Sequence, residues 1–142
     1  MKIYADSSFL VSLYSLDAHT IDARRTMQSS NGPRFLITLG EVEVVNAFGL
    51  RVFRKELSAS QAQLSLIDFE QDVRDGIFEI RGTTEGMIER ARQLSGQTTA
   101  KLGTRTADLL HVAAALELGA DCLYSFDQKQ RRLAQSVRLK LN

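Results

Sequence analysis

The chain has 142 residues, of which 44% are hydrophobic and 25% are charged, and its formal net charge is +1. This is the composition of one ordinary globular domain, and the near-neutral charge identifies no class of partner. No apolar run approaches the ~18 residues that a membrane span requires. The early polar residues Asp6, Ser7 and Ser8 argue against a signal peptide. The single cysteine, Cys122, excludes an internal disulfide and a multi-cysteine zinc site, so we expect a cytoplasmic protein.

The first half of the chain predicts two strands, each followed by helices. The first strand ends on Asp6 and precedes an apolar run, and Asp17 is a candidate N-cap for the next helix. The triplet Asn31-Gly32-Pro33 is a strong turn signal. In chain order we expect a strand at residues 2–5, a short helix at 9–14, a helix at 17–30, a strand at 34–38, a helix at 39–57 and a helix at 58–74.

The second half continues the alternation of strands and helices. Thr83 or Thr84 is expected to cap a helix that ends near Leu94, and the polar residues 95–103 are expected to form a loop. The next helix, at residues 104–118, is apolar almost all round and should be buried. The remaining elements expected are strands at residues 77–80, 121–127 and 137–141, and a short basic helix at 128–135.

Regular alternation of strands and helices predicts an α/β fold with a mainly parallel sheet and right-handed crossovers. The sequence contains no internal repeat, no low-complexity tract and no hairpin signal. We therefore expect residues 1–142 to form a single domain.

Two glutamates, Glu41 and Glu43, lie on opposite flanks of the helix at residues 39–57, because two residues are separated by about 200°. Asn46 follows Glu43 by one turn and falls within an apolar arc that we expect to face the core. A buried amide needs a polar partner, so Glu43 rather than Glu41 is expected to face a polar site. The apolar arc comprises Val42, Val45, Gly49, Val52 and Phe53.

Four carboxylates are expected to meet at one edge of the sheet. Asp6 and Asp127 end strands, whereas Glu43 and Asp108 lie near the starts of helices, and these positions share the carboxyl edge of a parallel sheet. Clustered carboxylates stay ionised only with a compensating charge. A set of oxygen ligands favours Mg²⁺ or Mn²⁺ over zinc. Such a site is equipped for metal-assisted hydrolysis of a phosphodiester.

Each of these acids also has a structural alternative. Asp6 and Asp127 could be helix N-caps, Asp108 could be a first-turn residue favoured by the helix dipole, and Glu43 could be a surface charge. His111 lies one turn from Asp108, and we expect it to be a hydrogen-bonded core residue rather than a catalyst.

Basic residues form three local clusters. Such clusters could contact phosphate groups, or they could simply be solvated helix faces. They comprise Arg24 with Arg25, Arg51 with Arg54 and Lys55, and Arg131 with Arg132.

Four short motifs resemble those of the PIN domain, and within it the toxin ribonucleases of VapC type. The first is Asp6-Ser7-Ser8 after a strand, and the second, at residues 39–48, has Glu43 followed three positions later by Asn46. The third, at residues 103–116, has its acid at Asp108, and the fourth is Ser125-Phe126-Asp127, where Thr is commoner than Ser. The resemblance spans nearly the whole chain and contains all four acids in order.

The resemblance implies a sheet of about five parallel strands flanked by helices in an α/β/α sandwich. It implies an Mg²⁺- or Mn²⁺-dependent endoribonuclease, a tRNA or rRNA substrate, a homodimer and a cognate antitoxin protein. Asp6, Glu43, Asp108 and Asp127 match the metal-binding and catalytic acids of the family, which makes Asp6 a metal ligand rather than a cap. Ser8 and Asn46 match positions that support those acids or their waters by hydrogen bonding.

Two other functions stay open. An Asp-dependent phosphatase would use Asp6 as a nucleophile, but such sites usually have Asp at the second motif position, where this chain has Ser8. A catalytically silent PIN-like RNA-binding or scaffold protein is the other alternative, and the presence of all four acids argues against it.

Overall fold

The computed structural model describes residues 1–142 and contains a five-stranded sheet in the order β3-β2-β1-β4-β5. All four pairs of neighbouring strands are parallel, and β1 lies in the middle, between β2 and β4. The predicted parallel α/β sheet is therefore confirmed. The strands are β1 (Ile3–Ala5), β2 (Arg34–Ile37), β3 (Glu79–Arg81), β4 (Cys122–Tyr124) and β5 (Lys140–Leu141).

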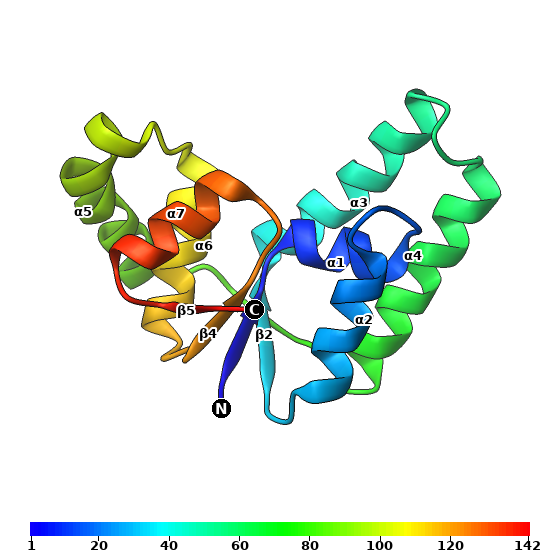
Figure 1. Ribbon diagram of the computed structural model, residues 1–142, viewed down its shortest axis with the longest axis horizontal. Coiled ribbons are helices and arrows are strands. Elements are labelled where there is room, and N and C mark those ends of the chain that lie inside the picture. The colour runs from blue at the N-terminus through cyan, green and yellow to red at the C-terminus, as the bar shows by residue number, and fades with distance from the viewer.

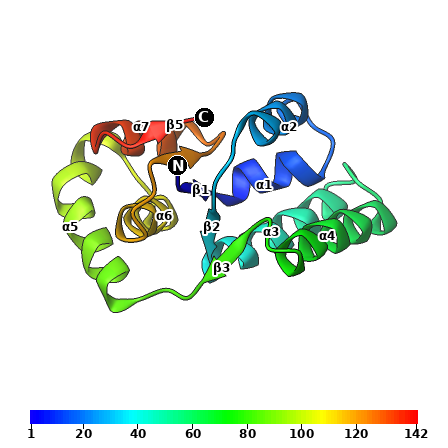
Figure 2. The ribbon, with the colours of Figure 1, turned by 90° about the horizontal axis from the view of Figure 1, so that it is seen from below.

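Seven helices cover the two faces of this sheet, with α1–α4 on one face and α5–α7 on the other (Figures 1 and 2). This is the α/β/α sandwich that the resemblance implied. The helices are α1 (Ser7–Tyr14), α2 (Thr20–Ser29), α3 (Thr38–Phe53), α4 (Ala59–Arg74), α5 (Glu85–Leu102), α6 (Thr106–Glu117) and α7 (Gln128–Ser136).

The core is divided into two apolar clusters by the sheet. Side chains of β1 alternate between the faces, as the pleat of a strand requires. Ile3 and Ala5 pack with α1–α4, whereas Tyr4 packs with α5–α7. All three are completely buried. The direction of Tyr4 matters for the functional site, because it places the phenol beneath α6.

Four of the seven helices, α1, α4, α5 and α7, begin after a residue whose side chain caps them. Ser58 caps α4 in a reciprocal capping box with Gln61, and Thr84 caps α5. The predicted helix start at Asp17 is wrong, because α2 begins at Thr20. Asp17 instead accepts hydrogen bonds from the backbone N–H of His19 and from other side chains.

The predicted loop at residues 95–103 is helical. Leu94, Thr98 and Leu102 recur every fourth residue and are buried or half-buried, so the inward face of α5 continues through this polar stretch. Gly103 then ends α5 in the left-handed conformation, with φ of 62°. Even α5, with 18 residues the longest helix, lacks the apolar character that a membrane crossing would require, as do the other helices.

The inward face of α3 differs from the predicted one. Gly40, Val44 and Phe48, spaced four residues apart, are buried: Val44 and Phe48 lie in the apolar cluster of α1–α4, and Gly40 lies against Leu36 and His111. Val42 and Phe53 of the predicted arc are 64% and 84% exposed. Both faces of α3 carry apolar side chains, so periodicity alone did not distinguish the face that packs from the face that is left exposed.

Candidate functional site

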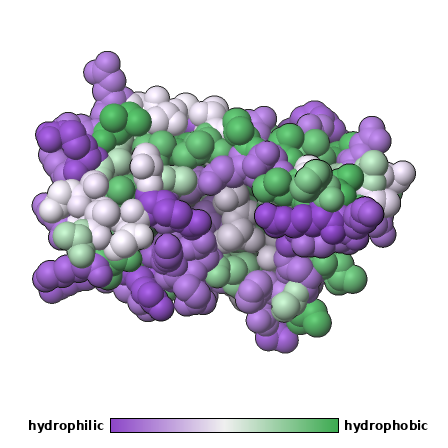
Figure 3. Space-filling model, turned by 90° about the horizontal axis from the view of Figure 1, so that it is seen from above, coloured by the Kyte–Doolittle hydropathy of each residue, from purple (hydrophilic) through white to green (hydrophobic).

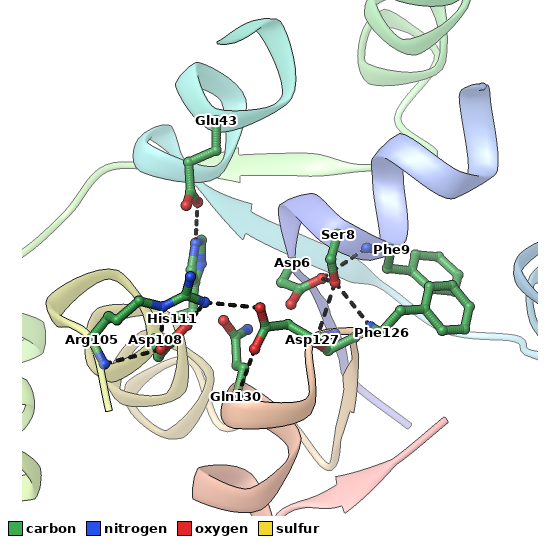
Figure 4. Close-up of polar contacts among 11 residues, drawn as sticks. Asp6, Ser8, Phe9, Glu43, Arg105, Asp108, His111, Phe126, Asp127 and Gln130 are labelled. Carbon is green, nitrogen blue, oxygen red and sulfur yellow. Dashed lines mark hydrogen bonds and ion pairs between the residues drawn. The ribbon is translucent and has the colours of Figure 1, made fainter. Parts of the chain in front are cut away.

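Four acidic side chains lie at the carboxyl edge of the sheet (Figure 4). Asp6 directly follows β1, and Asp127 lies three residues after the end of β4, which pairs with β1. Glu43 lies in α3, which begins immediately after β2, and Asp108 lies in the first turn of α6. The parallel sheet thus brings together acids that are spread along the whole chain.

Asp6 is the most deeply buried of the four, with 1% of its surface exposed. Its Oδ1 accepts a hydrogen bond of 2.7 Å from the Ser8 hydroxyl and one of 2.9 Å from the backbone N–H of Phe9. The Ser8 oxygen in turn accepts a hydrogen bond from the backbone N–H of Phe126 at 2.9 Å, which ties the start of α1 to the loop after β4. Burial raises the pKa of Asp6, and the nearby Ser125 hydroxyl and His111 oppose that rise. The predicted hydrogen bond between Ser8 and one of the acids is therefore present.

Two of the acids are helix caps as well as candidate ligands. Asp6 is the N-cap of α1, and Asp127 is the N-cap of α7, where its Oδ1 accepts the backbone N–H of Gln130 at 3.0 Å. The expectation that Asp6 is not a cap is therefore wrong. The backbone N–H groups at the start of a helix have no partner within the helix, so a preceding Asp satisfies one of them.

Arg105 links two of the acids, Asp108 and Asp127. Its guanidinium donates to both oxygens of Asp108 at 3.1 Å and to Oδ2 of Asp127 at 2.9 Å. The backbone N–H of Arg105 also donates to Oδ2 of Asp108. The Arg105 side chain is 58% exposed, whereas that of Asp108 is 4% exposed, so the guanidinium lies at the surface over a buried carboxylate. The two acids raise the pKa of Arg105.

Glu43 is held by a buried histidine. His111 Nε2 contacts Oε1 of Glu43, and His111 Nδ1 lies 2.8 Å from the hydroxyl of Tyr4. Burial raises the pKa of Tyr4 well above its usual value, which keeps the phenol protonated as a donor. An ionised carboxylate only accepts hydrogen bonds, so Nε2 of His111 is the donor to Glu43. The prediction that His111 is a hydrogen-bonded core residue is confirmed.

Two other polar residues of α3, Glu41 and Asn46, lie apart from the four acids. Glu41 and Asn46 are exposed, and the side-chain hydrogen bonds of the four acids do not include Asn46. Asn46 shares the exposed face of α3 with Val42 and Val45. The expected support of the acids by Asn46 is therefore not found in this structure, whereas Glu43 does face the site.

In each of the four acids the two carboxylate oxygens differ in their hydrogen bonds. One oxygen is held by a backbone N–H or by His111, and the other accepts no backbone hydrogen bond. In Asp108 and Asp127 the second oxygen contacts only the Arg105 guanidinium. In this arrangement no three Asp, Glu, His or Cys side chains are grouped closely enough to hold one metal ion. The acids thus converge on one edge, but Arg105 and His111 hold three of them in separate contacts.

Sequence reasoning missed Arg105 and Tyr4. Arg105 precedes Asp108 by three residues, the spacing at which an acid in the first turn of a helix reaches back to the N-cap residue, and that pattern is visible in the sequence. Tyr4 alternates with two apolar residues in β1, but its contact with His111 spans 107 positions and has no local signal.

The profile of the PIN domain family matches residues 3–136. A search of curated proteins finds no match. Among solved structures, the chain is similar to the VapC20 toxin of Mycobacterium tuberculosis, which is described as cleaving the sarcin–ricin loop. The TM-score is 0.70 and the sequence identity is 18%, and the match covers 92% of this chain and 93% of that one. It is also similar to VapBC-1 from nontypeable Haemophilus influenzae, with a TM-score of 0.64 and 15% identity over 100% of this chain and 97% of that one.

At such low identities the structural likeness concerns the fold, and it agrees with the sheet order and layers described above. The family profile extends from the first residue of β1 to the last residue of α7, and so includes all four acids. The chain belongs to the PIN domain family.

Proposed function

We propose that residues 1–142 form a single-domain, metal-dependent endoribonuclease that cleaves RNA phosphodiester bonds in the cytoplasm as the toxin of a toxin–antitoxin pair. The observation that supports this most is the meeting of Asp6, Glu43, Asp108 and Asp127 at one edge of the sheet. The likeness to a toxin described as cleaving the sarcin–ricin loop supports a structured tRNA or rRNA as the substrate class.

The donor chemistry of the site fits Mg²⁺ or Mn²⁺. Each of the four acids offers an oxygen that the backbone does not use, and hard divalent cations prefer such oxygen ligands. A bound ion would neutralise the carboxylates and lower the pKa of a water for attack on phosphorus. Arg105 competes for the same oxygens of Asp108 and Asp127, and its exposed side chain is free to turn toward a phosphate instead.

Exposed apolar side chains on α3 and α4 support the proposed protein partners, a second copy of the chain and a cognate antitoxin. Val42, Val45 and Phe53 of α3 are exposed, as are Leu64 and Ile67 of α4. Figure 3 shows exposed apolar side chains interspersed with polar ones on the face seen from above. Exposed apolar side chains on neighbouring helices are typical of protein contacts.

The proposed nuclease activity predicts that the purified chain cleaves RNA when Mn²⁺ or Mg²⁺ is added and that EDTA abolishes the cleavage. Asp108→Asn removes one ligand charge and should lower the cleavage rate about a hundredfold or more, since a metal contributes several kcal/mol and 1.36 kcal/mol is a factor of ten. The matched control is Asp68→Asn, because Asp68 is exposed on α4. Gel analysis of end-labelled RNA measures the rates, and full activity in EDTA or in Asp108→Asn would rule out the proposal.

The contact between His111 and Glu43 predicts a positioning role for the imidazole. His111→Ala leaves the Glu43 carboxylate without its only side-chain donor and should weaken Mn²⁺ binding about 10- to 100-fold, as the loss of outer hydrogen bonds does at other metal sites. His111→Gln offers an amide donor in place of Nε2 and should retain part of the affinity. Isothermal titration with Mn²⁺ measures this directly, and equal affinity in the wild type and both variants would show that His111 does not position Glu43.

A further inference from the structure

Three aromatic rings form a column that runs from the core to the surface beside Asp127. Phe9 is completely buried and stacks on Phe126, with ring centroids 5.7 Å apart and planes inclined by 20°. Phe126 stacks in turn on His19, at 4.4 Å and 9°. His19 is exposed and its side chain makes no hydrogen bond, so its ring is held only by stacking on the partly buried ring of Phe126.

Two hollows flank the outer end of this column, and both are lined by His19 and Phe126. The first, of about 390 Å³, also reaches Ser8 and Asp127 of the acidic site and is lined by Arg51 and Arg54. The second, of about 400 Å³, is lined by Arg25 and Arg131. Each hollow therefore combines aromatic and basic side chains with one further acid, Asp17 or Asp22, and the first hollow reaches Asp127 of the acidic site.

The four arginines that line the hollows differ in the number of hydrogen bonds and ion pairs that their side chains make. Arg51 bonds Ser15 and Asp17, and Arg131 bonds the Ser125 carbonyl and Asn142. Arg25 has only an exposed contact with Asp22, in which both side chains are more than half exposed. Arg54 is exposed and makes no side-chain hydrogen bond or ion pair, so its charge is free for a ligand.

We propose that the column and its two hollows form a binding track for a single-stranded segment of RNA. This proposal rests on the proposed nuclease function. A nucleobase stacks on the outer face of His19, and the adjoining phosphates lie in the hollows, one of them against Arg54. Unpaired bases stack on aromatic side chains irrespective of sequence, and basic grooves follow the backbone. The track ends at Asp127, so the bound strand is delivered to the carboxylates.

The first test measures the binding of a short, fluorescein-labelled single-stranded RNA of mixed sequence to the full chain in EDTA, by fluorescence anisotropy. His19→Ala removes the stacking platform and should weaken binding about fivefold to a hundredfold. His19→Phe keeps an aromatic face and should bind nearly as well as the wild type. Because His19 is exposed and does not cap α2 through its side chain, both variants should fold, as circular dichroism will check.

The second test measures how the affinity for the same RNA depends on salt concentration. Arg54→Gln removes one phosphate contact, so the slope of log K against log salt should become less steep by about 0.7 for a single strand. Lys101→Gln is the control, because Lys101 is exposed near the end of α5, on the other face of the sheet. Its slope should equal that of the wild type.

Equal binding by the wild type and His19→Ala, or an unchanged slope in Arg54→Gln, would overturn the proposed track even if the wild type cleaves RNA with Mn²⁺. Binding that depends on His19 and Arg54 in a protein that does not cleave RNA would support the track and contradict the proposed nuclease. The two failures are therefore distinguishable, because binding is measured without metal and cleavage is measured with it.

Discussion

Asp6→Asn should reduce metal-dependent RNA cleavage about a thousandfold or more. The substitution keeps the oxygen that accepts from Ser8 and from the backbone N–H of Phe9, so the cap of α1 survives, but it removes the negative charge. Loss of a carboxylate from a metal site costs several kcal/mol of transition-state stabilisation, and each 1.36 kcal/mol is a factor of ten. Cleavage of end-labelled RNA in Mn²⁺ measures the effect, and retention of more than a tenth of the wild-type rate would contradict the central role of Asp6.

The same variant should be more stable than the wild type when no metal is present. Burial raises the pKa of Asp6, so the ionised carboxylate is disfavoured in the folded chain relative to the unfolded one. The stability contributed by the protonated group is present below the pKa of the unfolded chain and is lost as the pH rises through the raised pKa of the folded chain. Thermal melts in EDTA should therefore show a higher Tm for Asp6→Asn near neutral pH, and the difference should shrink in acid. A lower Tm at neutral pH would show that the hydrogen bonds of Asp6 outweigh its desolvation.

Phe9→Ala should lower the free energy of unfolding by about 3–5 kcal/mol, the usual cost of truncating a fully buried phenylalanine. The ring of Phe9, a residue of α1, packs against the sheet, 5.0 Å from the ring of Tyr124 and 5.7 Å from that of Phe126. A domain of this size is stable by only about 5–15 kcal/mol, so the variant should be close to its unfolding threshold. Urea titration followed by circular dichroism measures the loss.

Phe53→Ala is the matched control, because the same truncation there removes a side chain that is 84% exposed. Its free energy of unfolding should stay within about 0.5 kcal/mol of the wild-type value. A comparable loss in both variants would mean that Phe53 is covered by protein in solution. Wild-type stability in Phe9→Ala would mean that the column of rings contributes little to the core.

The sequence alone predicted the order of strands and helices, the parallel sheet and the edge at which the acids meet. These features follow from local patterns: short apolar runs that end on a carboxylate, helical periodicity, and the shared edge of strand ends and helix starts. The choice of Glu43 over Glu41 was also made from helix geometry, and Glu43 is the one that contacts His111. The four motifs, in their order along the chain, also predicted the family.

Only the tertiary structure decided which side of a helix is buried and which partners the acids have. The exposed and buried faces of α3 both carry apolar residues, and packing against α1 and α4 selected Val44 and Phe48. The polar end of α5 is helical because an inward face continues through it, which composition did not reveal.

The contacts of the acids depend on the same long-range packing. Tyr4 and His111 are separated by 107 positions, and Arg105 and Asp127 by 22, so no local pattern predicts that they meet. The sequence offered capping and metal binding as alternatives for Asp6. The structure shows why they need not exclude each other, since a carboxylate has two oxygens and the backbone of α1 uses only Oδ1.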